Sequence, residues 1–233
     1  MREMRDVLGE VQARIDAACR RVGRDSGEVE VIAVTKTHGA EVVKEAWDAG
    51  LRIVGENKVQ EAAWKKPASV TGPLWHLIGH LQTNKARLAV QHATVIQSID
   101  SLRLLRLVDK EAARIGRTIK VMLQLHVAQE ETKSGFTPDE LIEAANSGEL
   151  DGLTNVTITG LMAMATNTDD MALVEREFAT VQQVFETLKC TAFAGSPAFA
   201  EVSMGMSDDW PIAVRHGSTL VRIGTAIFGP REY

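Results

Sequence analysis

Short apolar runs alternate along this chain with stretches that carry apolar residues at helical spacing. The runs are rich in Val, Ile and Leu and lack the polar alternation of a strand that faces water on one side. Strands of a parallel sheet are buried on both faces, so their sequences read as continuous apolar runs. The pattern predicts eight strands, the fifth being the longest, at residues 31–36, 51–54, 74–78, 94–98, 119–127, 156–162, 201–204 and 220–223.

The segments between these runs predict helices. The first helix covers residues 1–22 and precedes the first strand, and Asp100-Ser101 is placed to cap a helix at 102–115. Further helices are expected at 41–49, through 64–67, from 84, through 146, at 170–189 and from Ser207. Residues 191–199, rich in Ala, Gly and Pro, follow neither pattern.

This alternation of strands and helices predicts an α/β fold. Eight strand-then-helix units fit a single (β/α)8 TIM-like barrel over residues 1–233, with an extra N-terminal helix. The main alternative is a doubly wound open sheet, which rarely needs eight parallel strands in so short a chain. No low-complexity linker and no shift in composition divides the sequence, so one domain is expected.

Charge and cysteine content narrow the class of protein. Lys and Arg number 26 against 31 Asp and Glu, and the formal net charge of −5 argues against bulk binding to nucleic acid or to an anionic membrane. Cys19 and Cys190 show no metal-binding spacing, so we expect a reducing, cytoplasmic setting without disulfides or structural zinc. The charged start is unlike a signal peptide, and no apolar run approaches the length of a membrane span.

Lys36 ends the first predicted strand, where the sheet meets its loops. Partial burial at this place would lower the pKa of the amine and make it a nucleophile toward carbonyl groups. A lysine that has merely reached solvent is the commoner situation, so this residue alone does not establish a site.

Two glycine-containing segments follow the last two predicted strands. Loops at these positions of a (β/α)8 barrel often hold a phosphate, and here they are Gly205-Met-Ser207 and Gly224-Thr225. Glycine lets the backbone approach an anion, while helix N–H groups and a Ser or Thr hydroxyl donate to it. Ser207 alone is better explained as a helix cap, but two such segments together favour a phosphate.

Arg222 precedes Gly224 by two residues, so the side-chain directions at these two positions are on the same face of the last strand. An arginine in proteins stays charged and needs an acceptor, such as a carboxylate, a phosphate or a ring nitrogen. A structural ion pair with an inward acid is an equally good explanation of Arg222 in isolation.

Other polar residues near the predicted loops are Glu56, Asn57, His76, His80, Asn84, Lys85, Lys133 and His216. Of these, His76 lies inside a strand and is expected to be a hydrogen-bonded core histidine. A lysine beside two phosphate segments indicates pyridoxal 5′-phosphate (PLP), whose aldehyde forms an imine with lysine. The sequence lacks the motifs of P-loop NTPases, α/β-hydrolases and zinc peptidases.

Seven longer motifs run from about residue 31 to the C-terminus. They are Ala33-Val-Thr-Lys36-Thr, Gly55-Glu-Asn-Lys-Val-Gln-Glu61, Trp75-His-Leu-Ile-Gly-His-Leu-Gln-Thr-Asn-Lys85, Lys133-Ser-Gly135, Gly160-Leu-Met162, Ser203-Met-Gly-Met-Ser-Asp-Asp209 and Val221-Arg-Ile-Gly-Thr-Ala-Ile-Phe-Gly229. Together they closely resemble the pyridoxal phosphate homeostasis proteins, PLP-binding proteins related to alanine racemase. Two departures, His38-Gly39 and Lys58, replace the commoner Lys-Pro and Tyr of many relatives.

The resemblance implies a barrel of PLP fold-type III in which Lys36 forms the imine with the cofactor. It also implies roles for five further residues. Ser207, Gly224 and Thr225 would surround the phosphate, Arg222 would lie near the pyridine nitrogen, and Asn57 would lie beside the ring.

A cationic Arg at the pyridine nitrogen disfavours its protonation, so a carbanion is stabilised less than beside an Asp. Racemases of the related fold add a tyrosine from a further domain and a partner subunit, whereas the single tyrosine here is Tyr233. The leading hypothesis is therefore a monomeric PLP carrier or buffer with little or no catalysis of its own, which could serve PLP-dependent apo-enzymes.

Two other functions stay open at this point. A small amino-acid racemase would need a second proton donor, for which His80 and Lys133 are the candidates. A sugar-phosphate enzyme of the barrel class would use Lys36 as an aldolase-type lysine, and Arg222 would then have no special purpose.

Overall fold

The computed structural model describes residues 4–130, 133–206 and 208–229. Its strands are all parallel and pair in sequence order around a closed barrel, in which the last strand returns to the first. They are β1 (Glu30–Val34), β2 (Ile53–Glu56), β3 (Leu74–Leu77), β4 (Val95–Ile99), β5 (Ile119–Leu125), β6 (Val156–Ala163), β7 (Glu201–Ser203) and β8 (Leu220–Ile223). The predicted (β/α)8 barrel is confirmed.

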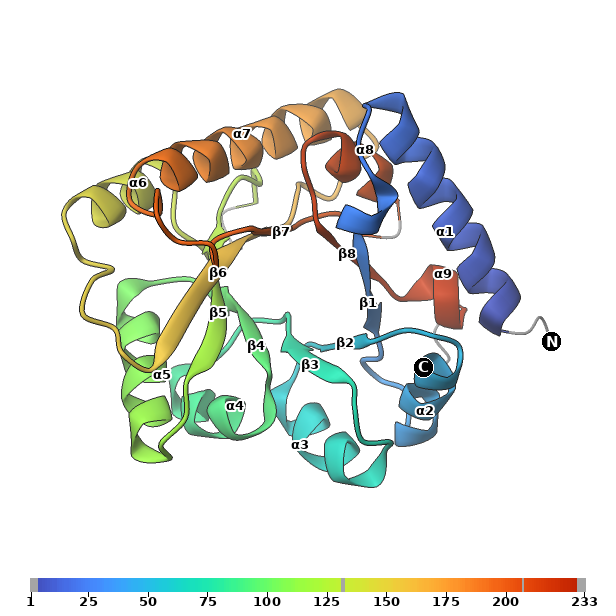
Figure 1. Cartoon of the computed structure of the whole chain (residues 1–233), viewed down its shortest axis with the longest axis horizontal. Coiled ribbons are helices and arrows are strands. Elements are labelled where there is room, and N and C mark those ends of the chain that lie inside the picture. Colours follow the sequence, from blue (N-terminus) through green and yellow to red (C-terminus); the bar gives the residue numbers. More distant parts are fainter. Residues whose placement is uncertain (1–3, 131–132, 207, 230–233) are drawn as a thin grey trace.

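Helices surround the strands (Figure 1). They are α1 (Met4–Arg21), α2 (Ala40–Asp48), α3 (Val59–Ala68), α4 (Ala86–His92), α5 (Leu102–Arg114), α6 (Pro138–Asn146), α7 (Met171–Cys190), α8 (Trp210–Arg215) and α9 (Thr225–Phe228), with short 3₁₀ turns at Ser26–Glu28 and Thr83–Lys85. Ser101 caps α5 as predicted, its hydroxyl accepting from the N–H of Leu104. None of the helices in the described ranges combines the length and apolar character that crossing a bilayer requires.

Three local predictions are corrected. Strand β1 ends at Val34, so Lys36 lies in the turn beyond the strand and not at its last position. Strand β2 lies two residues later than expected and includes Glu56, which is fully buried. The longest strand is β6, with 8 residues against 7 in β5.

The segments after the last helices also differ from the prediction. A four-residue helix, α9, follows β8 and was not expected. Residues 191–199 form turns, where Phe193 and Phe199 stack with ring centroids 4.1 Å apart. Helix α8 begins at Trp210, and the residue predicted to open it, Ser207, lies outside the described residues.

The barrel interior is apolar at its centre and polar toward the carboxyl ends of the strands. One layer consists of Ile32, Ile53, Val95, Met122, Met162 and Leu220, all buried. Two residues further along β4 and β8, Gln97 and Arg222 point the same way as Val95 and Leu220, and both are buried. The filled lower layer closes the barrel, so chemistry is confined to its carboxyl end.

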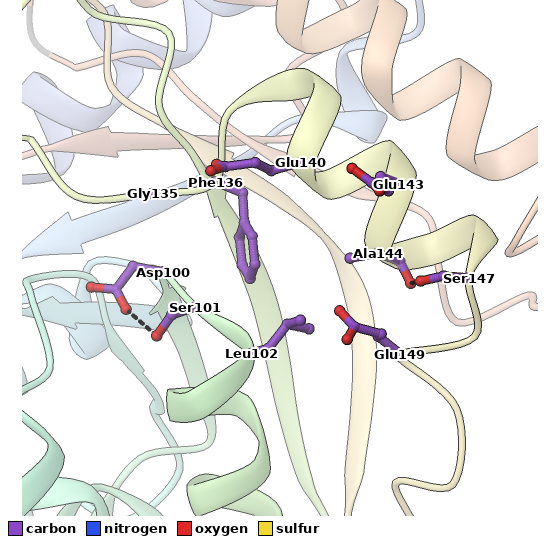
Figure 2. A pocket seen from close by; sticks show the side chains of 10 residues that line it. All are labelled: Asp100, Ser101, Leu102, Gly135, Phe136, Glu140, Glu143, Ala144, Ser147 and Glu149. Atoms are coloured by element: carbon purple, nitrogen blue, oxygen red, sulfur yellow. Dashed lines mark hydrogen bonds between the residues drawn. The ribbon is translucent and has the colours of Figure 1, made fainter.

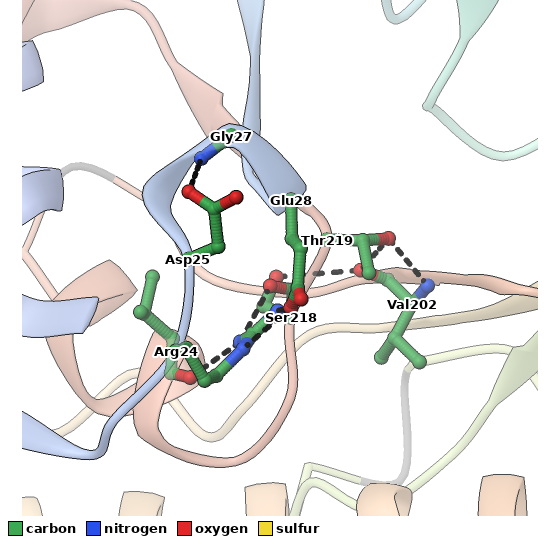
Figure 3. A network of polar contacts seen from close by, with 8 residues as sticks. Arg24, Asp25, Gly27, Glu28, Val202, Ser218 and Thr219 are labelled. Carbon is green, nitrogen blue, oxygen red and sulfur yellow. Dashed lines mark hydrogen bonds and ion pairs between the residues drawn. The ribbon is translucent and has the colours of Figure 1, made fainter. Parts of the chain in front are cut away.

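The N-terminal helix is held by α8 and α9. Figure 1 shows α1 lying beside these two helices. It buries Ile15 and Cys19, and the guanidinium of Arg14 lies 5.0 Å from the ring centroid of Trp210. After α1, Arg24 Nη1 donates to the carbonyl of Ser218 at 3.1 Å (Figure 3). The same nitrogen donates to the carbonyl of Val214 at 2.7 Å. The segment after α1 is thereby tied to the turn that feeds β8, at the end of the barrel opposite the polar layer.

Candidate functional site

A cavity of about 250 Å³ lies at the carboxyl ends of the strands, where (β/α)8 barrels place their chemistry. Five of the six predicted site residues line it: Lys36, Asn57, Arg222, Gly224 and Thr225. The sixth, Ser207, lies outside the described residues. The rest of the lining, which sequence reasoning missed apart from His80, consists of Val34, Ile78, Gly79, His80, Met164 and Met206. Each of these residues ends a strand or lies within about three residues after one, which is the signal that could have identified them.

Lys36 occupies the second position of a tight turn after β1. The N–H of His38 donates to the carbonyl of Thr35 at 3.1 Å, and Thr37 has φ 70°. A positive φ at the third position is typical of type II turns, which favour glycine there because a β-branched residue is strained in this conformation. The turn brings half-buried Lys36 to the cavity rather than continuing the strand.

Arg222 is held at the cavity floor by oxygen atoms of two neighbouring strands. Its Nη1 donates to the carbonyl and the hydroxyl of Ser203, at 2.7 and 2.8 Å, and Nη2 donates to the carbonyl of Ala163 at 2.7 Å. Burial lowers the pKa of Arg222 to about 10, against the attraction of Asp209. The acceptors of its three hydrogen bonds are neutral, and Asp209 is the acid that attracts its charge. The guanidinium has about five N–H groups in all, so donors remain for a ligand.

A directional chain of hydrogen bonds continues from Arg222 across the barrel. Ser203 Oγ accepts from Arg222 and donates to Gln97 Oε1 at 2.7 Å, and Gln97 Nε2 lies 2.8 Å from His76 Nδ1. Because the amide nitrogen can only donate, Nδ1 must accept, which places the imidazole proton on Nε2.

His76 is therefore neutral. Burial lowers its pKa to about 3, and Lys120 contributes in the same direction. A second proton, on Nδ1, would point at the N–H of the Gln97 amide, so this hydrogen bond would be lost. The prediction of a hydrogen-bonded core histidine is confirmed, and hydrogen bonds through Gln97 and Ser203 connect this histidine to Arg222.

Close backbone approaches shape the cavity wall. A Cβ on Gly79 would lie 2.4 Å from the carbonyl oxygen and 2.7 Å from the Cα of Asn57. A Cβ on Gly224 would lie 3.3 Å from Val34, which belongs to β1. The α9 segment begins at Gly224, whose carbonyl accepts from Ile227 and Phe228. The first-turn N–H groups of α9 therefore lie at the cavity edge.

Of the two candidates for a second proton donor, His80 lines the cavity and Lys133 does not. His80 lines the cavity, with Nδ1 at 3.2 Å from Asp100 Oδ2, and its side chain is 58% exposed. The amine of Lys133 is directed elsewhere, donating to the carbonyl of Ala165 at 2.7 Å and pairing with Glu130 at 3.0 Å.

A larger cavity, of about 780 Å³, lies between the start of α5 and α6 (Figure 2). Its rim carries the carboxylates of Asp100, Glu140, Glu143 and Glu149, around Leu102 and Phe136. A concentration of negative charge repels a phosphate, whereas the smaller cavity combines a lysine and an arginine. The barrel cavity is therefore the better candidate for an anionic ligand. Within the described ranges, no group of three or more His, Cys, Asp or Glu residues could hold a metal ion.

Comparison with known proteins agrees with this geometry. The family model for the N-terminal domain of alanine racemase matches residues 8–232. The pyridoxal phosphate homeostasis protein of Escherichia coli K12 is 39% identical over 242 residues, covering 100% of this chain and 99% of the relative. That of Haemophilus influenzae is 35% identical over 229 residues, covering 97% and 95%.

Solved structures give the same result. PipY of Synechococcus elongatus, determined with PLP bound, superposes with a TM-score of 0.82 at 35% identity and covers 97% of this chain and 100% of PipY. An alanine racemase of Clostridium difficile shares the fold, with a TM-score of 0.75 at 14% identity, over 99% of this chain and 56% of the racemase. The sequence relatives and the family model together lead to one assignment: the chain belongs to the pyridoxal phosphate homeostasis protein family, built on the alanine racemase N-terminal barrel.

Proposed function

We propose that this chain binds PLP in the barrel cavity and takes part in intracellular PLP homeostasis. The observation that carries the proposal is the convergence of Lys36, Arg222 and the start of α9 on one cavity. The donor set fits the group: an amine for the aldehyde, cationic and N–H donors for polar atoms, and apolar walls from Val34 and Ile78 for a flat ring. PLP supplies an aldehyde that bonds reversibly to amines and a ring that withdraws electrons.

The residues divide this task by position. Lys36 provides the amine that bonds to the aldehyde. Gly224 and Thr225, together with Ser207 as the resemblance implies, would provide donors for the phosphate, and Asn57 would lie beside the ring. Arg222, held by Ser203 and Ala163, would lie near the pyridine nitrogen and disfavour its protonation.

A carrier or buffer with little turnover explains the site better than an enzyme does. A cationic Arg222 beside the pyridine nitrogen would disfavour its protonation, so the ring would be a weaker electron sink than beside an acid. The relatives are named for PLP homeostasis. We propose a monomer that exchanges PLP with solvent and with PLP-dependent apo-enzymes.

One observation favours a second candidate, a small amino-acid racemase. His80 lines the cavity and pairs with Asp100, which could orient it as an acid or base. Incubation with single enantiomers of alanine and other amino acids, followed by chiral analysis, separates the two functions. Sustained turnover that requires both Lys36 and His80 would favour the racemase.

Absorbance spectroscopy tests PLP binding directly. Wild-type protein mixed with PLP is expected to show the absorbance band of a PLP–lysine bond near the visible edge. The Lys36→Ala variant should lack this band. Lys44→Ala, which removes an exposed lysine on α2, is the matched control and should retain it. Wild-type protein that takes up no PLP would refute the proposal.

Gly79→Ala should weaken PLP binding without unfolding the protein. Because the added methyl group would overlap the backbone of Asn57, the chain must shift at the cavity wall. Such overpacking costs about 1–3 kcal/mol, which corresponds to a loss in affinity of about fivefold to a hundredfold when the strain falls on the bound state. Spectroscopic titration measures the effect, and Gly195→Ala, where a Cβ meets open space, is the control. Equal affinities for the two variants would contradict the expectation.

A further inference from the structure

A fully buried ammonium group lies behind the turn that carries Lys36. Lys65, on α3, is 0% exposed. Its Nζ donates to the carbonyl of Thr35 at 2.9 Å, to Glu56 Oε1 at 2.8 Å and to Glu61 Oε2 at 2.9 Å. A lysine has about three N–H donors, so each of them is used.

The acceptors of Lys65 hold the chain on both sides of Lys36. Thr35 contributes its carbonyl to Lys65, and its hydroxyl donates to Glu56 Oε1 at 2.6 Å. On the other side, the backbone N–H of Thr37 donates to Glu61 Oε2 at 2.8 Å. One ammonium and two carboxylates thus fix the residues before and after Lys36.

The turn requires such support, because Thr37 has φ 70° and a β-branched side chain. A non-glycine residue in this region raises the energy of the backbone and persists only when its surroundings impose the conformation. The Glu61 carboxylate fixes the direction of the Thr37 N–H, which makes it the contact that opposes this strain directly.

The two carboxyl groups in this cluster, Glu56 and Glu61, have pKa values shifted in opposite directions. Burial raises the pKa of Glu56, against hydrogen bonds from Lys65 and Thr35. Burial also acts to raise the pKa of Glu61, but the Thr37 N–H and Lys65 outweigh it and hold the pKa below its ordinary value. Glu61 is therefore held in its ionised form, and its hydrogen bond to Thr37 is charge-assisted.

We propose that Glu61, oriented by Lys65, is a positioning residue that holds the Thr35–His38 turn and so directs Lys36 into the cavity. Neither Glu61 nor Lys65 lines the cavity, so neither touches a ligand there. The consequence for PLP rests on the proposed function. The hold on the turn is a property of the chain by itself.

Two readouts test this, one of them without any ligand. In Glu61→Ala, hydrogen exchange at the Thr37 and His38 amides should accelerate about tenfold or more, because an acceptor and its hold on the turn are lost. The apparent affinity for PLP at Lys36, from the absorbance band, should fall about tenfold or more. Glu61→Gln, which keeps an oxygen at this place, should recover part of both. Glu45→Ala, an exposed carboxylate on α2, should change neither.

A second substitution separates positioning from general damage. Thr37→Gly relieves the strain, so Glu61→Ala combined with Thr37→Gly should bind PLP within about threefold of Thr37→Gly alone. Glu61 is partly exposed, so folding of its variants is expected, and thermal unfolding confirms it for each.

Unchanged exchange at Thr37 in Glu61→Ala overturns the positioning role, whether or not the protein binds PLP. Normal PLP affinity in Glu61→Ala, or no rescue by Thr37→Gly, overturns it as well. If wild type takes up no PLP, the proposed function fails, while accelerated exchange in Glu61→Ala still supports the hold on the turn.

Discussion

Gly160→Ala is expected to lower the free energy of unfolding by about 3 kcal/mol or more. Gly160 pairs with Glu201 of β7, and a Cβ at Gly160 would lie 1.7 Å from the Glu201 carbonyl oxygen and 2.6 Å from its carbonyl carbon. The β5–β6 register shifts immediately beside it, as in a β-bulge. Since both partners of the clash are backbone, no side-chain rotation can relieve it. Strand β7 must move, and with it Ser203, which holds Arg222.

The same substitution elsewhere provides the control. Gly9 lies inside α1, where an added Cβ meets nothing within 4 Å. Alanine is favoured over glycine in a helix by up to about 1 kcal/mol, so Gly9→Ala should leave stability unchanged or raise it. Urea unfolding followed by circular dichroism measures both variants. A Gly160→Ala protein as stable as wild type would show that the barrel tolerates a shift of β7.

The second large effect is a loss of stability in acid that depends on His76. The unfolded chain binds a proton at this histidine near its ordinary pKa of 6.5, whereas the folded protein resists until about 3. Between these values the unfolded state binds more protons, so stability is fully present above pH 6.5 and falls as the pH decreases. From pH 7 to pH 4 the loss amounts to about 3 kcal/mol from this group alone.

His76→Gln isolates that contribution, because other groups also titrate in acid. The variant cannot bind a proton at this position, so its stability should fall less steeply between pH 7 and pH 4. The difference in unfolding free energy between wild type and variant should change by about 3 kcal/mol over this interval. Parallel curves for the two proteins would mean that the folded protein protonates His76 without difficulty.

Continuous apolar runs were sufficient to predict parallel strands buried on both faces, and the number of these runs, eight in a short chain, favoured the barrel over a doubly wound open sheet. They could not predict where β1 and β2 end. The sequence predicts a first strand that includes Thr35 and a second that stops before Glu56, whereas β1 stops before Thr35 and β2 includes Glu56. Both residues are fully buried because Lys65 arrives from α3 to bond with them. A polar residue is buried only when its partner is present, and that partner is determined by tertiary structure.

The residues of the site could likewise be predicted in part, whereas the contacts between them could not. Lys36, Gly224 and Thr225 are predicted from their positions at strand ends, Arg222 from its place on the last strand, and Asn57 from the family resemblance. The structure brings all five to one cavity. The chain of hydrogen bonds from Arg222 to His76 could not be predicted, because its members come from strands far apart in sequence. Thr37 likewise gives no signal of a left-handed backbone, since glycine is the residue that such turns favour.

The register of β1 with β8, which places Ile32 opposite Arg222, has a consequence for when the protein can bind PLP. Lys36 follows the first strand and Gly224 the last, so the cavity forms only after both ends of the barrel have met. A chain still emerging from the ribosome would have the lysine but not the arginine. In the proposed complex the ligand spans this seam, so by mass action it opposes opening of the barrel there, by about 2.7 kcal/mol at a hundredfold excess over the dissociation constant. Occupied protein should therefore resist proteolysis at β1 and β8 better than empty protein does.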